Sequence, residues 1–180
     1  MKKVVVVGAG PAGLKAAEIL CAAGVAVAVY DAMPGAGRKF LLAGKGGLNL
    51  THSEPALRFT TRHGAPRAQL APMLASFGAE QLRNWAGELG VQTFVGSSGR
   101  VFPLDMKAAP LLRAWLHRLR HADPAVQLFM RHRWSGWIEA QRSAGVALRF
   151  ETAQGTEQVA ADAVVLALGG GSRARLGSDG

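Results

Sequence analysis

Residues 4–31 read VVVVGAGPAGLKAAEILCAAGVAVAVYD, and this stretch decides the fold. Val4–Val7 is a short, β-branched, wholly apolar run, which is typical of a strand buried on both faces of a parallel sheet. Residues 14–23 carry the apolar stripe of a helix, and Gly24 provides a stop signal. Residues 25–30 then predict a second strand that ends at Asp31. Strand, glycine-rich turn, helix and strand within about 30 residues form one β-α-β unit with a right-handed crossover.

The glycine-rich turn has the spacing Gly8-x-Gly10-x-x-Gly13 and opens the helix with Pro11 and Ala12. The first glycine permits a tight turn, the second lets the backbone approach a pyrophosphate, and the third lets the helix pack on the strand. Asp31 follows after 17 intervening residues, where a carboxylate can accept hydrogen bonds from the hydroxyls of a ribose. The pattern therefore predicts a dinucleotide site. The alternative is a structural turn with an incidental Asp.

The rest of the chain divides into an irregular stretch, helices and short strands. From Met33 to about His63 the periodicity is lost among glycines and polar residues, which predicts a long loop of the kind that is usually functional. Beyond it we expect helices over residues 68–77, 79–89 and 110–121, strands over 91–95 and 100–102, and a β-meander over 126–130, 134–140, 146–152 and 156–160. A last buried strand, residues 162–168, runs into Gly169–Gly171.

Composition and charge limit the class of protein. A chain of 180 residues, nearly half hydrophobic, can bury one core, and its single cysteine, Cys21, excludes an internal disulfide framework. No apolar run approaches the ~20 residues of a membrane helix, so we expect a soluble, cytoplasmic protein. Cys21 lies on the apolar stripe of the first helix and is expected to be a buried structural thiol. The histidines lack a spacing for metal ligands supported by Cys or carboxylates: His52, His63, His117, His121 and His132.

The formal net charge is +9, and much of it lies between Arg113 and Arg133. A positive field favours polyanionic partners, whether cofactor phosphates, anionic substrates or RNA. The alternative is a solvated basic surface without a partner. Charge alone does not decide between them.

Two features favour FAD over NAD as the dinucleotide. Gly37-Arg38 follows Asp31 by a few residues, where many FAD-binding proteins carry a Gly-Arg pair, and Ala32 and Lys39 flank the same segment. The late strand that ends Leu168-Gly169-Gly170 resembles the strand that passes the cofactor in glutathione-reductase-like FAD proteins. Its glycines leave room for backbone to lie against a ligand.

The resemblance becomes specific in four blocks, found in order along the chain. They are GRKFLLAGKGGLNLTH at residues 37–52, GRVFP at 99–103, LGGGS at 168–172 and GSDG at 177–180. Together they resemble the BaiN/YhiN-type flavoproteins, NAD(P)/FAD-dependent oxidoreductases. Many relatives have GGGRCNxTN where this chain has GKGGLNLTH at residues 44–52, so any role of their Cys does not transfer.

The resemblance implies an α/β, Rossmann-type FAD-binding domain of the glutathione-reductase-like kind over residues 1–180, with a parallel sheet, a β-meander and a small helical insertion. It also implies a substrate domain and a later FAD-contacting segment beyond residue 180, so we expect a fragment of a longer protein. The segment after Gly37 lies near the flavin in that family. Trp134 begins a strand whose backbone meets the adenine in FAD proteins of this fold.

No catalytic residue is identified, but three polar residues are candidates. Lys45 and Asn49 are expected near the isoalloxazine, where a Lys stabilises anionic reduced flavin and an Asn bonds ring atoms; for Lys45 the alternative is a phosphate contact or plain surface. Arg100 could bind an anionic substrate or tie a turn. The expected function is hydride transfer between NAD(P)H, flavin and a small organic acceptor such as an activated C=C bond. The alternatives are a flavin oxidase that uses oxygen and a flavoprotein that reduces or binds an RNA base.

Overall fold

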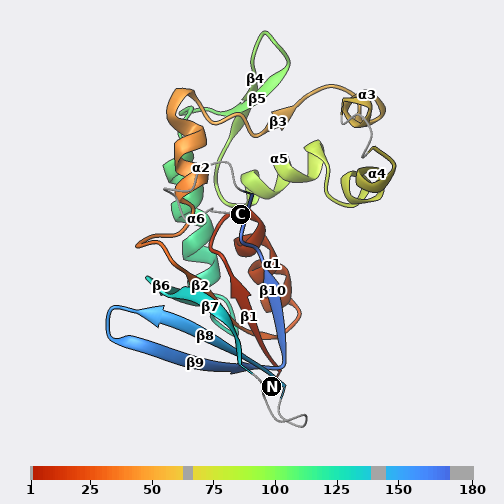
Figure 1. Ribbon diagram of the computed structural model, residues 1–180. Helices are drawn as coiled ribbons and strands as arrows, with labels where there is room; N and C mark the ends of the chain where they lie inside the picture. The colour runs from red at the N-terminus through yellow and green to blue at the C-terminus, as the bar shows by residue number, and fades with distance from the viewer. Residues whose placement is uncertain (1, 63–66, 139–144, 171–180) are drawn as a thin grey trace. The chain divides into compact units, whose positions relative to one another are not determined.

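The computed structural model describes residues 2–62, 67–138 and 145–170, and the chain divides into two compact units. The first unit comprises Met1–Phe40 and Leu116–Gly180, and the second comprises Leu41–Trp115. Figure 1 labels the elements of both.

The first unit is built on a parallel four-stranded sheet. Its order is β10-β1-β2-β6, formed by β10 (Ala163–Leu166), β1 (Lys3–Val7), β2 (Ala26–Asp31) and β6 (Gln127–Met130). Helix α1 (Pro11–Ala22) connects β1 to β2 and contacts both strands, as the β-α-β pattern predicted. The Rossmann-type α/β fold expected from the sequence is confirmed.

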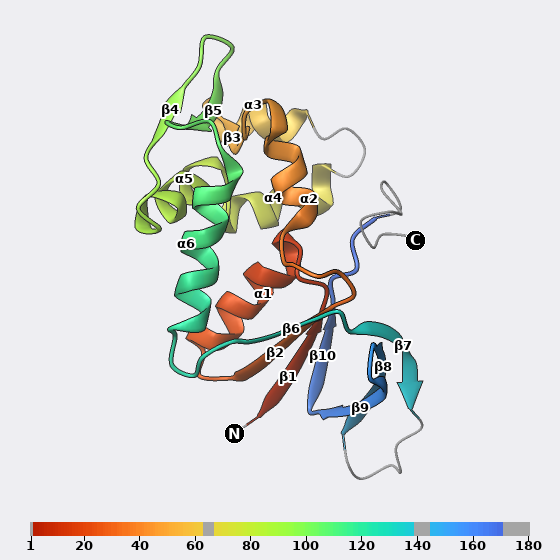
Figure 2. The ribbon, with the colours of Figure 1, turned by 90° about the vertical axis from the view of Figure 1, so that its left-hand side faces the viewer.

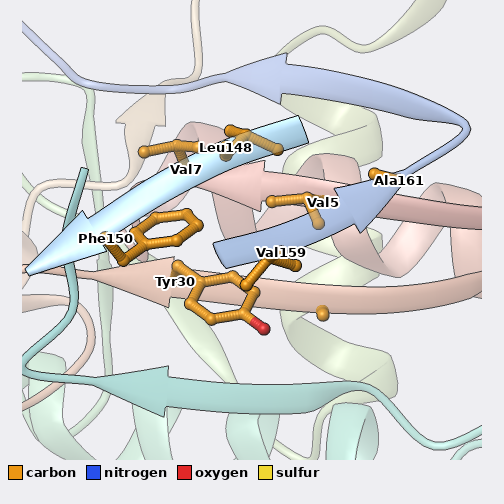
Figure 3. Close-up of a cluster of buried hydrophobic side chains, with 8 residues drawn as sticks. Val5, Val7, Tyr30, Leu148, Phe150, Val159 and Ala161 are labelled. Carbon is orange, nitrogen blue, oxygen red and sulfur yellow. The ribbon is translucent and has the colours of Figure 1, made fainter. Parts of the chain in front are cut away.

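A second, antiparallel sheet covers the other side of the parallel sheet. It contains β7 (Arg133–Ile138), β8 (Val146–Thr152) and β9 (Gly155–Ala161), in the order β7-β8-β9. Figure 2 shows α1 and this sheet on opposite sides of the parallel strands. The core between the sheets is a cluster of side chains from β1, β2, β8 and β9, which includes Val5, Tyr30, Leu148 and Phe150 (Figure 3).

The prediction of a four-stranded meander was wrong for its first strand. Residues 127–130 form β6, which pairs in parallel with β2, with Asp31 opposite Met130. The chain leaves the parallel sheet at Arg131, whose φ of 62° lies in the left-handed region, and only then enters the antiparallel sheet. A short apolar run fits either sheet, so the pattern of residues 126–130 does not reveal its partner.

The second unit combines helices with a small antiparallel sheet. The sheet has the order β3-β5-β4, with β3 (Thr51–His52), β5 (Arg100–Pro103) and β4 (Thr93–Val95). The helices are α2 (Arg38–Ala43), the 3₁₀ turn η1 (Gly44–Gly46), α3 (Ala56–Thr61), α4 (Arg67–Ser76), α5 (Ala79–Glu88) and α6 (Ala108–Arg120). The unit boundaries fall within α2 and α6.

The prediction of one long irregular loop from Met33 to about His63 was also wrong. It contains α2, η1, β3 and α3. Each element is too short to show a period: α2 and α3 have 6 residues each, and β3 has 2. Strand β3 forms because Thr51 and His52 pair with Val101 and Arg100. This pairing is a tertiary contact, so the local sequence pattern does not predict it.

Across the residues that the structure describes, no helix is long and apolar enough to cross a membrane.

Candidate functional site

The glycine loop after β1 is held by the end of β2 and the turn that follows it. Gly8 N donates to Tyr30 O at 2.7 Å, and Ala9 N donates to Asp31 Oδ2 at 2.6 Å. On its other side the Ala9 carbonyl accepts a hydrogen bond from Gly37 N at 2.8 Å. The Ala9 residue is therefore fixed from both sides, and this fixes the direction of the loop.

The three glycines of the motif differ in what a side chain would meet at each position. A Cβ on Gly8 would overlap the Ala167 carbonyl, and Gly8 also has a φ of +109°. A Cβ on Gly13 would overlap the Gly8 carbonyl. A Cβ on Gly10 would meet no atom of the described residues within 4 Å. Packing explains Gly8 and Gly13, whereas the space beside Gly10 is left for something other than this unit's own atoms.

That space belongs to a cavity of about 350 Å³, which lies at the carboxyl ends of the parallel strands. Ligands bind at this position in open α/β sheets. The cavity is lined by Val7, Gly8, Ala9, Gly10, Pro11, Ala12, Tyr30, Asp31, Ala32, Met33, Gly35, Gly37, Arg38, Lys39, His132, Arg133, Trp134, Ala167, Leu168 and Gly169. A Cβ on Gly35 would also meet nothing within 4 Å.

Asp31 lies in the cavity wall, and its carboxylate already organises the backbone around it. Besides the bond from Ala9 N, Asp31 Oδ1 accepts a hydrogen bond from Met33 N at 2.7 Å. A carboxylate has about four lone-pair positions, so each oxygen retains capacity for a ligand hydroxyl. Asp31 can therefore shape the loop and bind a ribose diol.

Tyr30, which lines the cavity, is held in place by two other aromatic side chains. Tyr30 stacks on Phe129 and on Phe150, with ring centroids 4.6 and 4.4 Å apart. Burial, with a smaller contribution from the negative charge of Glu157, raises the pKa of Tyr30 to about 12. The Tyr30 hydroxyl is thus neutral at physiological pH.

Most residues predicted for the cofactor meet in this one cavity. Gly13 packs beneath the loop instead, and Gly170 accepts a hydrogen bond from Lys39 Nζ at 3.2 Å. Lys45, Asn49 and Arg100 belong to the second unit and are exposed there. Residues 171–180, which hold the end of the LGGGS block and the whole GSDG block, lie outside the described residues.

Several lining residues were not predicted from the sequence, among them Tyr30, Met33, Gly35, His132 and Arg133. His132 and Arg133 could have been found, because they follow a strand of the parallel sheet at its carboxyl end. The assignment of that strand to the meander hid this signal.

Cys21 is a buried structural thiol, as predicted. It is 4% exposed, and its Sγ donates to Pro124 O at 2.9 Å. Burial raises the pKa of the Cys21 thiol, and the nearby Asp123 carboxylate raises it further. In the described part of the chain, no group of three or more His, Cys, Asp or Glu residues could hold a metal ion.

Comparison with known families now connects the cavity to a class of proteins. The model for the HI0933-like protein Rossmann domain matches residues 2–180. The chain belongs to the HI0933-like family. The resemblance to BaiN/YhiN-type flavoproteins is thereby confirmed.

Solved structures share the fold at low sequence identity. The open conformation of a flavocytochrome c3 fumarate reductase aligns with a TM-score of 0.67 at 19% identity, over 94% of this chain and 34% of that one. The 3-ketosteroid-delta4-(5alpha)-dehydrogenase from Rhodococcus jostii RHA1 aligns with a TM-score of 0.63 at 18% identity, over 94% of this chain and 46% of that one. The chain therefore spans less than half the length of either. A search of curated protein sequences gives no significant match.

Proposed function

We propose that this HI0933-like chain binds FAD, with the ADP half in the cavity of the first unit, and serves a flavin-dependent oxidoreductase. The observation that carries the proposal is the open space beside Gly10, in a cavity that also contains Asp31. A pyrophosphate requires close backbone approach, and a ribose diol requires an acceptor, and the two are adjacent here.

The family and the fold support this proposal. The two solved structures described above are a reductase and a dehydrogenase, and one is a flavocytochrome. Flavin, when bound, supplies the exchange of a hydride or of single electrons. The residues of the cavity would bind and orient it: the loop amides and the N-terminus of α1 toward phosphate, and Asp31 toward ribose.

The reaction partners are the finer part of the proposal. NAD(P)H is the proposed electron donor, and an organic molecule such as an activated C=C compound is the proposed acceptor. Lys45, Asn49 and Arg100 are the proposed polar contacts of flavin and substrate. Anaerobic reduction of the flavin by NADH or NADPH, followed by admission of oxygen or of an acceptor, separates this reaction from that of an oxidase.

A second candidate is a flavoprotein that acts on RNA. Its support is a group of exposed basic side chains in the first unit: Arg120, His121, Arg131 and Arg133. RNA binding through such residues would weaken steeply as salt is raised, which filter binding at several salt concentrations would detect.

The cavity assignment is tested by Gly10→Val. Because the new Cβ has no neighbour within 4 Å among residues 2–62, 67–138 and 145–170, the variant should fold, yet its side chain would occupy pyrophosphate space. We expect FAD binding, measured by flavin fluorescence, to be present in the wild-type chain and abolished in the variant. Gly87→Val is the matched control, since a Cβ on Gly87 also meets nothing and Gly87 does not line the cavity. Full flavin occupancy in folded Gly10→Val would reject the placement.

A further inference from the structure

His132 occupies the point where the chain passes from the parallel sheet to the antiparallel sheet. Its backbone N donates to Asp31 O at 2.9 Å, and the preceding Arg131 N donates to Met33 O at 3.1 Å. The segment 131–132 is thus paired with the turn after β2. That turn forms one wall of the cavity, and His132 lines the cavity as well.

The His132 ring faces two hydrogen-bond acceptors. Nδ1 lies 2.8 Å from Met130 O, and Nε2 lies 3.2 Å from Glu157 Oε2 on β9. A carbonyl and a carboxylate both accept, so only a ring that carries a proton on each nitrogen makes both bonds. The neutral ring, with one N–H, must give up one of them.

Aromatic contacts restrict the ring to this position. It meets Tyr30 edge-on, with centroids 5.5 Å apart, and Phe129 at 5.8 Å. The His132 side chain is 19% exposed. A ring held in this way cannot rotate freely to recover a lost hydrogen bond.

We propose that His132 is a positioning residue for the adenosine end of the cofactor: its protonated ring joins Glu157 to Met130 and thereby holds the turn after β2 in the shape that binds FAD. This inference rests on the proposed function. It adds that the affinity for FAD depends on the protonation of one histidine outside the glycine motif.

Two carboxylates and two arginines are the other charged groups on the elements next to the ring. These groups are Asp31 on β2, Arg131 in the connecting segment, Arg133 on β7 and Glu157 on β9, and Glu157 is the one that bonds the ring. Carboxylic acids and arginines ordinarily titrate outside the range between about pH 5.5 and 8, where histidine titrates. Tyr30, with its pKa raised to about 12, remains neutral there too.

The test is the affinity for FAD, measured by flavin fluorescence between about pH 5.5 and 8. The pyrophosphate of FAD does not titrate in this range. In the wild-type chain we expect affinity to fall about three- to tenfold as pH rises, the scale of one hydrogen bond. His132→Gln should bind more weakly at low pH and lose the slope. Glu157→Gln, at a side chain that is 47% exposed, should fold normally and flatten the slope.

Glu18→Gln is the matched control. Glu18 also pairs with a cation in the first unit, Lys15 at 2.9 Å, but does not line the cavity, so its variant should keep the wild-type slope. Tyr30 is the only tyrosine, so its ionisation reports whether a variant is folded. In every folded variant its tyrosinate absorbance should appear at a higher pH than that of a free tyrosine, because burial raises the pKa of Tyr30.

Each outcome of these titrations either supports or overturns the positioning role. A flat profile in folded Glu157→Gln and His132→Gln supports the positioning role. A slope that persists in both variants, or a flat profile in the wild-type chain, overturns it. Absence of FAD binding at every pH in the wild-type chain overturns the proposed function, and the inference with it.

Discussion

Two glycine-rich segments of this chain differ in what their glycines are for. In the Gly8–Gly13 loop of the first unit, Gly8 and Gly13 fit against backbone and Gly10 faces open cavity. In the Gly44–Gly47 segment of the second unit, a Cβ on Gly44 would lie 2.6 Å from Ala108 Cβ, and one on Gly47 would lie 2.6 Å from Met106 Cε. There only Gly46 faces open space.

The comparison teaches that a glycine-rich sequence does not by itself indicate a ligand. Gly44 is explained by packing within its own unit and Gly47 by its φ of +111°, and packing also explains two of the three motif glycines in the first unit. The informative glycine is one that packing does not require and that lines a cavity. By this criterion Gly10 and Gly35 indicate a ligand, and the motif spacing alone would have indicated only Gly10.

The largest effect is expected from Gly13→Ala. The new Cβ would overlap the Gly8 carbonyl, and that atom is backbone and cannot rotate away. We expect a loss of about 3 kcal/mol or more in the free energy of unfolding, measured by urea denaturation, because α1 must move away from β1. Gly10→Ala is the control and should unfold like the wild-type chain. Equal stability of the Gly13 and Gly10 variants would remove the distinction between the two positions.

A smaller effect is expected from Asp31→Ala, which tests whether the Gly8–Gly13 loop and Asp31 together bind the cofactor. The substitution removes the acceptor of the Ala9 and Met33 amides and the proposed ribose contact, so affinity for FAD should fall by about 1.5–3 kcal/mol. Asp162→Ala is a matched control, because Asp162 Oδ2 likewise accepts from a backbone amide, Lys3 N at 2.6 Å, but does not line the cavity. It should affect stability and leave the dissociation constant of FAD unchanged. The same loss of affinity in both variants would contradict the ribose role.

The fold was predictable where the signal is local. The β-α-β unit follows from a β-branched run, a glycine turn and an apolar helix stripe, all within residues 4–31, and α5 and α6 follow from their apolar periods. Among the elements that were missed or misplaced, α2 and α3 are too short to show a period, whereas β3 and β6 depend on distant partners. β3 is defined by pairing with β5, and the sheet that β6 joins is decided by its contact with β2.

The candidate site was predictable to a similar extent and for the same reason. The spacing of the motif glycines and Asp31 predicts their place in the site. His132 and Arg133 line the cavity only because β6 pairs with β2, which the local sequence does not show. The clamp on Ala9 by Asp31 and Gly37 joins residues up to 28 positions apart, so no window of sequence contains it as a pattern.

The smallest effect, and the one that tests the second segment, is expected from Gly46→Ala. Gly46 lies in a 3₁₀ turn, and its Cβ would meet nothing within 4 Å, so the variant should fold and gain about 0.4–1 kcal/mol by restricting the unfolded chain. Gly44→Ala, blocked by Ala108, should instead lose about 1–3 kcal/mol. On the proposal that this segment lies near the isoalloxazine, a methyl group there would disturb that end of the cofactor. We therefore expect Gly46→Ala to weaken FAD about two- to tenfold, the equivalent of a fraction of a hydrogen bond to one hydrogen bond. It should leave the affinity for ADP-ribose unchanged, whereas Gly10→Val weakens the binding of both ligands.

Calorimetric titration of FAD and of ADP-ribose into the Gly46→Ala and Gly10→Val variants makes the comparison. Unchanged affinity for FAD in Gly46→Ala would mean that the open glycine of the second segment does not serve the cofactor.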